Sequence, residues 1–145
     1  MKKNPSAPLS KELIELGNQR WQELQSHAQF ITSFNMFEEH IKVAFSLSEF
    51  IFDQCIKNPS WLAALLIEKQ LLTEQVDYQD KLFQLLVEID SEAVLHQKLR
   101  QFRNFHMLRI AWRDLFNIQP IENSLTQVSE LARQLITQTN SWLYQ

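Results

Sequence analysis

The chain contains a single glycine, Gly17, among 145 residues. β-Hairpins need turn residues that accept positive φ angles, and glycine is the usual choice for that position. No Asn-Gly, Asp-Gly or Gly-Gly pair occurs anywhere in the sequence. The sequence therefore predicts an all-α fold with negligible strand content.

The stretch from residue 90 to residue 117 has the strongest helical pattern in the chain. Side chains on one helical face recur at three- and four-residue steps: Leu95, Leu99, Phe102, His106, Ile110 and Arg113. From Met107 onward a second apolar row makes the C-terminal half apolar over most of its circumference, which is typical of a buried helix. Asp90 is an N-cap residue by type, so we expect the helix to begin there. This long helix should be the centre of a helical bundle.

Cap residues and helical spacing predict further helices around the central one. We expect them to begin near Ser10, Ser33, Ser48, Asn58, Tyr78 and Ser124. Asn58 should form a corner, because the proline that follows disfavours the α conformation at Asn58 and suits the first turn of a new helix. Ser124 and Gln127 have the spacing of a capping box. The prediction is a bundle of six or seven helices.

Length and composition indicate one soluble domain. The chain has 145 residues, of which 45% are hydrophobic and 21% charged. Residues 1–9 form a polar, proline-marked lead that should be loosely ordered, and residues 10–145 should form a single helical domain. No apolar run approaches the ~20 residues of a membrane span, and no signal-peptide pattern follows Lys2 and Lys3. We expect a cytoplasmic chain without a membrane partner and, since it ends inside an amphipathic helix, an N-terminal fragment of a longer enzyme.

The residue types that metal binding or catalysis requires are scattered along the chain. No two of the aspartates form a D-x-D pair: Asp53, Asp77, Asp80, Asp90 and Asp114. The histidines never form a helical metal-binding pair: His27, His40, His96 and His106. We expect His106 to be a hydrogen-bonded core histidine and Cys55 to be a small buried hydrophobe. The sequence predicts no catalytic, cofactor-binding or metal-binding residue.

The central stretch is basic although the whole chain carries a net charge of −3. Its cations are Lys98, Arg100, Arg103, Arg109 and Arg113. Arg109 and Arg113 lie within about 40° of one another on a helical wheel, and Arg100 and Arg103 lie on the other side, so no single basic stripe results.

Two interpretations of these arginines remain open. In the first interpretation, they bind an anion, such as a nucleotide phosphate, nucleic acid or an acidic partner. Alternatively, some are buried against acids of neighbouring helices, such as Glu49, Asp53 or Glu130, with their stems over the core. We expect the structural role, most firmly for Arg109, and no nucleic-acid partner.

Two runs in the central stretch, from Leu99 to Arg103 and from Met107 to Leu115, carry a family resemblance. They resemble the L-R-x-F-R and M-L-R-I-A-W-R-D-L signature in the N-terminal half of bacterial glutamine synthetase adenylyltransferase/adenylyl-removing enzymes. The signature residues are Leu99, Arg100, Phe102, Arg103, Arg109, Ile110, Ala111, Trp112, Arg113, Asp114 and Leu115. The resemblance extends to the segments 47–50, 58–62, 128–132 and 142–144, and departs from the family pattern at 104–106.

The resemblance implies a parent enzyme that transfers AMP from ATP to a tyrosine of glutamine synthetase and removes it by phosphorolysis. It implies Mg²⁺ and ATP as cofactors of the parent, and as partners glutamine synthetase, a PII-type signal protein and the remaining domains of the chain. The family's catalytic motif, a glycine-serine turn leading to an aspartate pair, has no counterpart here. We therefore expect a scaffold that precedes the catalytic core. The alternative is a free-standing helical module that offers an apolar groove to a partner helix.

Overall fold

The computed structural model describes residues 8–144, which form seven α-helices and two 3-10 helices and contain no β-strand. The elements are α1 (Lys11–Gln25), η1 (Thr32–Phe37), α2 (Glu38–Leu47), α3 (Glu49–Lys57), α4 (Pro59–Leu66), η2 (Gln70–Leu72), α5 (Tyr78–Leu86), α6 (Glu92–Leu115) and α7 (Ile121–Leu143). The all-α prediction is confirmed. Most of the lead expected to be loosely ordered, residues 1–7, lies outside the described residues.

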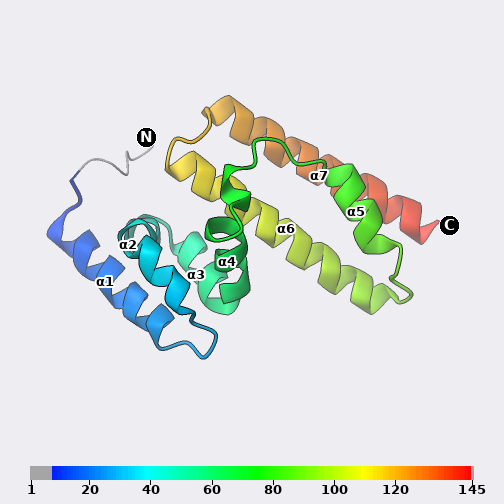
Figure 1. Ribbon diagram of the computed structural model, residues 1–145. Coiled ribbons are helices and arrows are strands. Elements are labelled where there is room, and N and C mark those ends of the chain that lie inside the picture. Colours follow the sequence, from blue (N-terminus) through cyan, green and yellow to red (C-terminus); the bar gives the residue numbers. More distant parts are fainter. Residues whose placement is uncertain (1–7, 145) are drawn as a thin grey trace.

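Helix α6 connects two groups of helices (Figure 1). Its C-terminal half lies against the group α1 to α4, and it contacts α3 directly. At the other end α5 and α7 lie side by side, and α7 also packs along α6. The long central helix is therefore confirmed as the element that both groups share.

The ends of α6 differ from the predicted residues 90 and 117. Ser91 has an extended backbone, with φ −131° and ψ 146°, and its side chain accepts a hydrogen bond from the Val94 N–H. Ser91 therefore takes the N-cap position expected for Asp90, since both residues are of the cap type and only one can occupy it. At the other end Asn117 has φ 54°, a left-handed conformation that ends the helix after Leu115.

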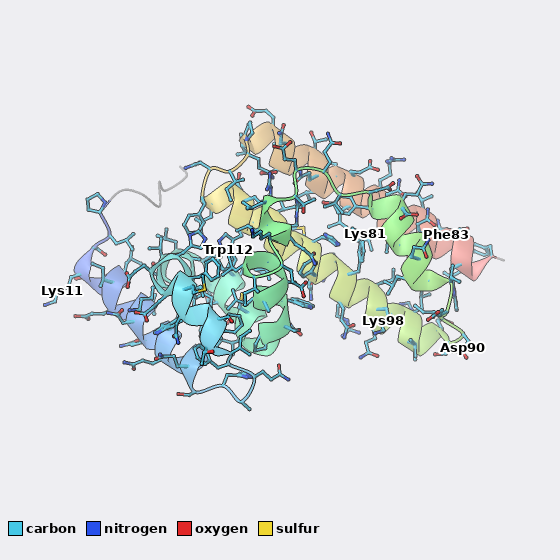
Figure 2. The ribbon with its side chains drawn as sticks, viewed as in Figure 1. Lys11, Lys81, Phe83, Asp90, Lys98 and Trp112 are labelled. Atoms are coloured by element: carbon cyan, nitrogen blue, oxygen red, sulfur yellow. The ribbon has the colours of Figure 1, made fainter. Side chains whose placement is uncertain are left out.

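The main core lies between α1–α4 and the C-terminal half of α6. Its buried residues are Trp21, Leu24, Phe34, Ile41, Ala44, Phe45, Ile51, Cys55, Leu62, Leu65, Leu66, Leu71, Leu108 and Trp112. Figure 2 shows Trp112 among these helices. Cys55 is fully buried, and burial raises the pKa of its thiol well above the ordinary range, which confirms its expected role as a small hydrophobe.

Two predicted helix starts are wrong. The helix expected after Ser33 begins as the 3-10 helix η1, and the α-helix starts only at Glu38. The capping box at Ser124 does not form, because α7 already starts at Ile121, directly after Pro120. Ser124 lies inside that helix, and its hydroxyl donates to Asp114 Oδ1 at 3.1 Å. The predicted corner at Asn58 is confirmed, with Pro59 in the first turn of α4.

Gly17 lies where α1 crosses α2, and not in a turn. A Cβ atom at this position would lie 2.7 Å from the backbone oxygen of Lys42. The only glycine of the chain therefore allows two helices to approach closely.

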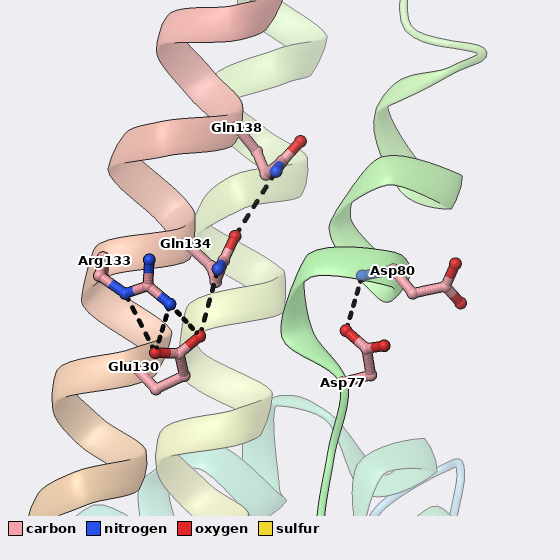
Figure 3. Close-up of polar contacts among 6 residues, drawn as sticks. All are labelled: Asp77, Asp80, Glu130, Arg133, Gln134 and Gln138. Atoms are coloured by element: carbon pink, nitrogen blue, oxygen red, sulfur yellow. Dashed lines mark hydrogen bonds and ion pairs between the residues drawn. The ribbon is translucent and has the colours of Figure 1, made fainter.

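The face of α7 that is turned toward α5 is polar (Figure 3). Gln134 donates to Glu130 at 3.1 Å and Gln138 donates to Gln134 at 3.5 Å, which forms a ladder along the helix. Gln138 and Asp77, the N-cap of α5, line the same small hollow. The apolar residues of α7 therefore lie on its other sides. Within residues 8–144, we find no helix with the length and apolar character that a membrane span needs.

Candidate functional site

Arg109 and Arg113 lie on successive turns of α6 and are buried, with 1% and 3% of their surface exposed. The Nε of Arg109 donates to the backbone oxygen of Gln70 at 3.1 Å. Arg113 Nη1 donates to the backbone oxygen of Leu71. Because both carbonyls belong to η2, the two arginines hold this short irregular element against the central helix.

Arg113 also joins the turn between α6 and α7. Its Nε donates to Gln119 Oε1 at 3.0 Å. The amide of Gln119 in turn donates to Ser124 Oγ at 2.9 Å and to Gln127 Oε1 at 3.0 Å. Gln127 reaches the backbone oxygen of Glu74, beyond η2, at 3.3 Å. Arg113 is therefore the centre of a polar network that ties three segments together.

The expected burial of these arginines is observed, but the expected acidic partners are not. Their hydrogen bonds go to backbone carbonyls and Gln119 instead of to Glu49, Asp53 or Glu130. Irregular backbone leaves carbonyls without helical partners, and a buried guanidinium can satisfy them. Burial lowers the pKa of Arg109, and the neighbouring charge of Arg113 lowers it further. Burial also lowers the pKa of Arg113, while Glu74 raises it.

His106 lies beside Arg109 and is 5% exposed. Its ring packs against the rings of Tyr78, Phe102 and Phe105. Burial, followed by the charges of Arg109 and Lys81, lowers the pKa of His106 to about 3. The histidine is therefore neutral at ordinary pH.

The expected burial of His106 is observed, but its Nδ1 atom lacks the hydrogen bond expected for a core histidine. Within the described part of the chain, four buried polar atoms have no hydrogen-bond partner: His106 Nδ1, Tyr78 Oη, and Nη1 and Nη2 of Arg109. Tyr78 packs against His106, and His106 lies about one turn before Arg109 on α6. The groups that pack around His106 are the rings of Tyr78, Phe102 and Phe105, and none of them forms a hydrogen bond with Nδ1.

Trp112 and His40 form a contact that the sequence did not predict. Trp112 Nε1 donates to His40 Nε2 at 2.9 Å. The imidazole also stacks on the Trp112 ring, at a centroid distance of 5.6 Å, and on Phe116 at 4.1 Å. Burial lowers the pKa of His40. The only sequence signal was the helical spacing of each residue on its own helix, which does not show that the two helices meet.

The eleven signature residues divide between the interior and the surface. Ile110 and Trp112 are buried with Arg109 and Arg113, and the partly exposed residues are Leu99, Phe102, Ala111, Asp114 and Leu115. Arg100 and Arg103 are exposed. The structure confirms that these two arginines lie apart from Arg109 and Arg113.

The geometry of this region defines a class of protein: an all-helical protein in which buried arginines of one long helix hold η2 and the α6–α7 turn against that helix. Among residues 8–144 no group of three His, Cys, Asp or Glu side chains could hold a metal ion. The aspartates Asp77 and Asp80 are near one another, but Asp77 accepts a hydrogen bond from the Asp80 backbone and caps α5. The described residues therefore include no group of ligands for the Mg²⁺ that the family resemblance implies for the parent protein.

The chain belongs to the glutamate-ammonia ligase adenylyltransferase family, whose model matches residues 38–145. It is similar to proteins named bifunctional glutamine synthetase adenylyltransferase/adenylyl-removing enzyme. That of Shewanella woodyi is 32% identical over 139 residues, covering 94% of this chain and 15% of the relative. That of Shewanella frigidimarina is 33% identical over 112 residues, covering 76% and 12%. That of Psychromonas ingrahamii is 39% identical over 100 residues, covering 68% and 11%.

These matches confirm the resemblance inferred from the signature in α6. The chain spans only 11% to 15% of the length of these three relatives. The family match includes all of α2 to α7 and therefore the whole arginine network. No solved structure matches the chain.

Proposed function

We propose that this chain is the N-terminal helical part of a bifunctional glutamine synthetase adenylyltransferase/adenylyl-removing enzyme, in which it serves as a scaffold and not as a catalytic domain. The observation that carries the proposal is the family match over residues 38–145, combined with the small share of the relatives that the chain covers. Nucleotidyl transfer needs acidic side chains that hold metal against phosphates, and no group of metal ligands occurs among residues 8–144, which supports a role outside catalysis.

The positions of the signature residues support a scaffold role. Trp112 is fully buried in the main core, and Arg113 links η2 to the turn before α7. Residues with such contacts fix the relative positions of helices. Because the helices are fixed relative to one another, they would hold an attached catalytic domain in a defined position.

Under this proposal the parent protein transfers AMP from ATP to a tyrosine of glutamine synthetase and removes it by phosphorolysis. Mg²⁺, ATP and the response to glutamine and a PII-type protein would belong to other parts of the parent, in the cytoplasm. The names of the relatives support the two activities. Glutamine synthetase would be the protein partner.

The test replaces the matching segment of the Shewanella woodyi enzyme with this chain. Transfer of AMP to glutamine synthetase and its removal are measured with the chimera, a deletion of the segment, and a chimera that carries Trp112→Ala. We expect the chimera to retain both activities, and the deletion and the Trp112→Ala chimera to lose them. The isolated chain should neither add AMP to glutamine synthetase when given Mg²⁺ and ATP, nor remove AMP from adenylylated glutamine synthetase when given Mg²⁺ and inorganic phosphate.

Two results would overturn the proposal. One is metal-dependent release of AMP from adenylylated glutamine synthetase by the isolated chain. The other is a deletion that leaves both activities of the parent unchanged. A reading frame that stops directly after Gln145 would favour the alternative, a free-standing interaction module.

A further inference from the structure

A groove runs along the junction of α6 and α7 on the side away from the buried arginines. It consists of two adjoining hollows of about 350 Å³ and 390 Å³, both of which are lined by Arg103 and Leu135. Its floor is apolar and is formed by Leu99, Met107, Val128, Leu131 and Leu135. We call this surface the α6–α7 groove.

The groove follows a single face of α6. At 100° per residue, the α6 side chains that line it between His96 and Met107 lie within about 140° of one another. These positions extend over about 16 Å of helix axis, at 1.5 Å per residue. The groove is therefore long enough for about three turns of another helix.

The rim of the groove is positive. Arg100 and Arg103 line it and are exposed. Arg103 donates to the amide oxygen of Asn104 at 3.3 Å. Within residues 8–144, neither arginine forms an ion pair with a carboxylate. An apolar floor beside two such cations is complementary to an amphipathic helix with acidic residues along one edge.

The apolar surface continues from the groove around α7. Leu125, Ile136 and Leu143 are 63%, 64% and 42% exposed, and they lie within about 20° of one another on the helical wheel. Ala132, which lines the groove, lies on the edge of the same stripe. The polar ladder of Glu130, Gln134 and Gln138 faces elsewhere (Figure 3). An apolar face of this extent, continuous with a groove, is typical of an interface between domains.

We infer that the α6–α7 groove holds an acidic amphipathic helix from the remaining part of the same polypeptide. The inference rests on the proposed function, because the chain spans only 11% to 15% of its relatives and a scaffold must contact the domains that it supports. The apolar floor contributes the buried area. Arg100 and Arg103 set the orientation of the helix through its carboxylates.

The experiment uses the parent polypeptide expressed as two pieces, residues 1–145 and the remainder, with their dissociation constant measured by calorimetry. The double variant Arg100→Glu with Arg103→Glu should weaken binding by about tenfold or more, since two attractive charge contacts become repulsive. Ala132→Trp should also weaken binding, because the indole ring of the new side chain would fill the groove. The matched control is Lys98→Glu, the same charge reversal on the same helix at a position about 140° or more away from both arginines on the helical wheel.

The other outcomes count against either the docking inference or the scaffold proposal. Equal binding by the double variant and Lys98→Glu would overturn it, provided that the melting temperatures of both match the unmodified chain. Sedimentation that shows a dimer of residues 1–145, broken by Ala132→Trp, would assign the groove to a second copy instead. If the chimera of the preceding section is active while the groove variants bind the remainder as tightly as the unmodified chain does, only the docking inference fails. Loss of activity in that chimera, with groove-dependent binding intact, would count against the scaffold proposal alone.

Discussion

The indole nitrogen of Trp112 and the Nε2 atom of His40 are 2.9 Å apart and joined by a hydrogen bond, although 72 positions separate the residues in the sequence. Because the indole can only donate, His40 Nε2 must be the acceptor. The imidazole is therefore neutral, with its proton on Nδ1. The contact joins α2 to α6 and gives the buried indole the partner that it needs.

Trp112→Ala should lower the free energy of unfolding by roughly 3–5 kcal/mol, the range for removing a large buried aromatic side chain. Urea denaturation measures the loss. Trp112→Phe keeps much of the ring volume but leaves His40 Nε2 without its donor, so its cost should be smaller. A loss below about 1 kcal/mol for the alanine variant would contradict the complete burial of Trp112.

The stability of the chain should fall as the pH is lowered below about 6.5, the ordinary pKa of histidine. Burial lowers the pKa of His40, and it lowers that of His106 to about 3. Between these values and 6.5 the unfolded chain binds more protons than the folded chain, so acid favours unfolding. His106 alone should contribute a loss of up to about 1.4 kcal/mol per pH unit in this window. Urea melts between pH 7 and pH 4.5 measure the slope.

The pH prediction has a matched pair of variants. His106→Phe keeps an aromatic ring in the site formed by Tyr78, Phe102 and Phe105 and removes the titrating group, so the slope should become shallower. His96→Gln changes an exposed histidine, whose side chain is 60% accessible, and is the control for a histidine substitution outside the core. Equal slopes for the unmodified chain and His106→Phe would contradict the assignment.

Gly17→Ala should destabilise the chain although alanine favours helices by about 1 kcal/mol over glycine. The new Cβ atom would lie 2.7 Å from the backbone oxygen of Lys42, and a backbone carbonyl cannot rotate away as a side chain does. Helices α1 and α2 would have to separate, at a cost of about 1–3 kcal/mol. Asn18→Ala, at the exposed next position, should be neutral or slightly stabilising. The two variants are compared in thermal melts.

The helical content and the central position of α6 could be predicted because both follow from local patterns. A single glycine and the three- and four-residue spacing of apolar residues constrain the chain without reference to its tertiary fold. The choice between Asp90 and Ser91 as the cap could not be predicted in the same way, since both have suitable side chains. It depends on which of the two has an extended backbone, and the turn after α5 decides that.

The partners of Arg109 and Arg113 were predicted wrongly for a related reason. Burial followed from the apolar neighbours Leu108 and Ile110 on the helix. The partners depend on how η2 folds back onto α6, and the backbone carbonyls that it presents carry no signature in the sequence. Asp114 and Ser124 illustrate the same limit: the spacing of Ser124 indicated a helix cap, whereas the α6–α7 turn brings it to Asp114.

The last prediction separates the structural role of the buried arginines from anion binding. Arg109→Ala and Arg113→Ala should each lower stability by roughly 3 kcal/mol, since each leaves a carbonyl of η2 without its donor, at about 1–3 kcal/mol, and opens a cavity. Arg133→Ala removes an arginine whose side chain is 65% exposed, and should change stability by less than about 0.5 kcal/mol.

Thermal melts of these variants, with and without millimolar ATP, provide the decisive comparison. If the buried arginines bound nucleotide, ATP would raise the melting temperature of the unmodified chain in a concentration-dependent manner, and the alanine variants would lose that response. We expect no such response. Arg113→Lys adds a further distinction, because it retains the positive charge but loses the planar fork that reaches Leu71 and Gln119 together. Stability restored by lysine would show that the positive charge alone is needed. A loss of stability close to that of Arg113→Ala would support the paired hydrogen bonds from Arg113 to Leu71 and Gln119.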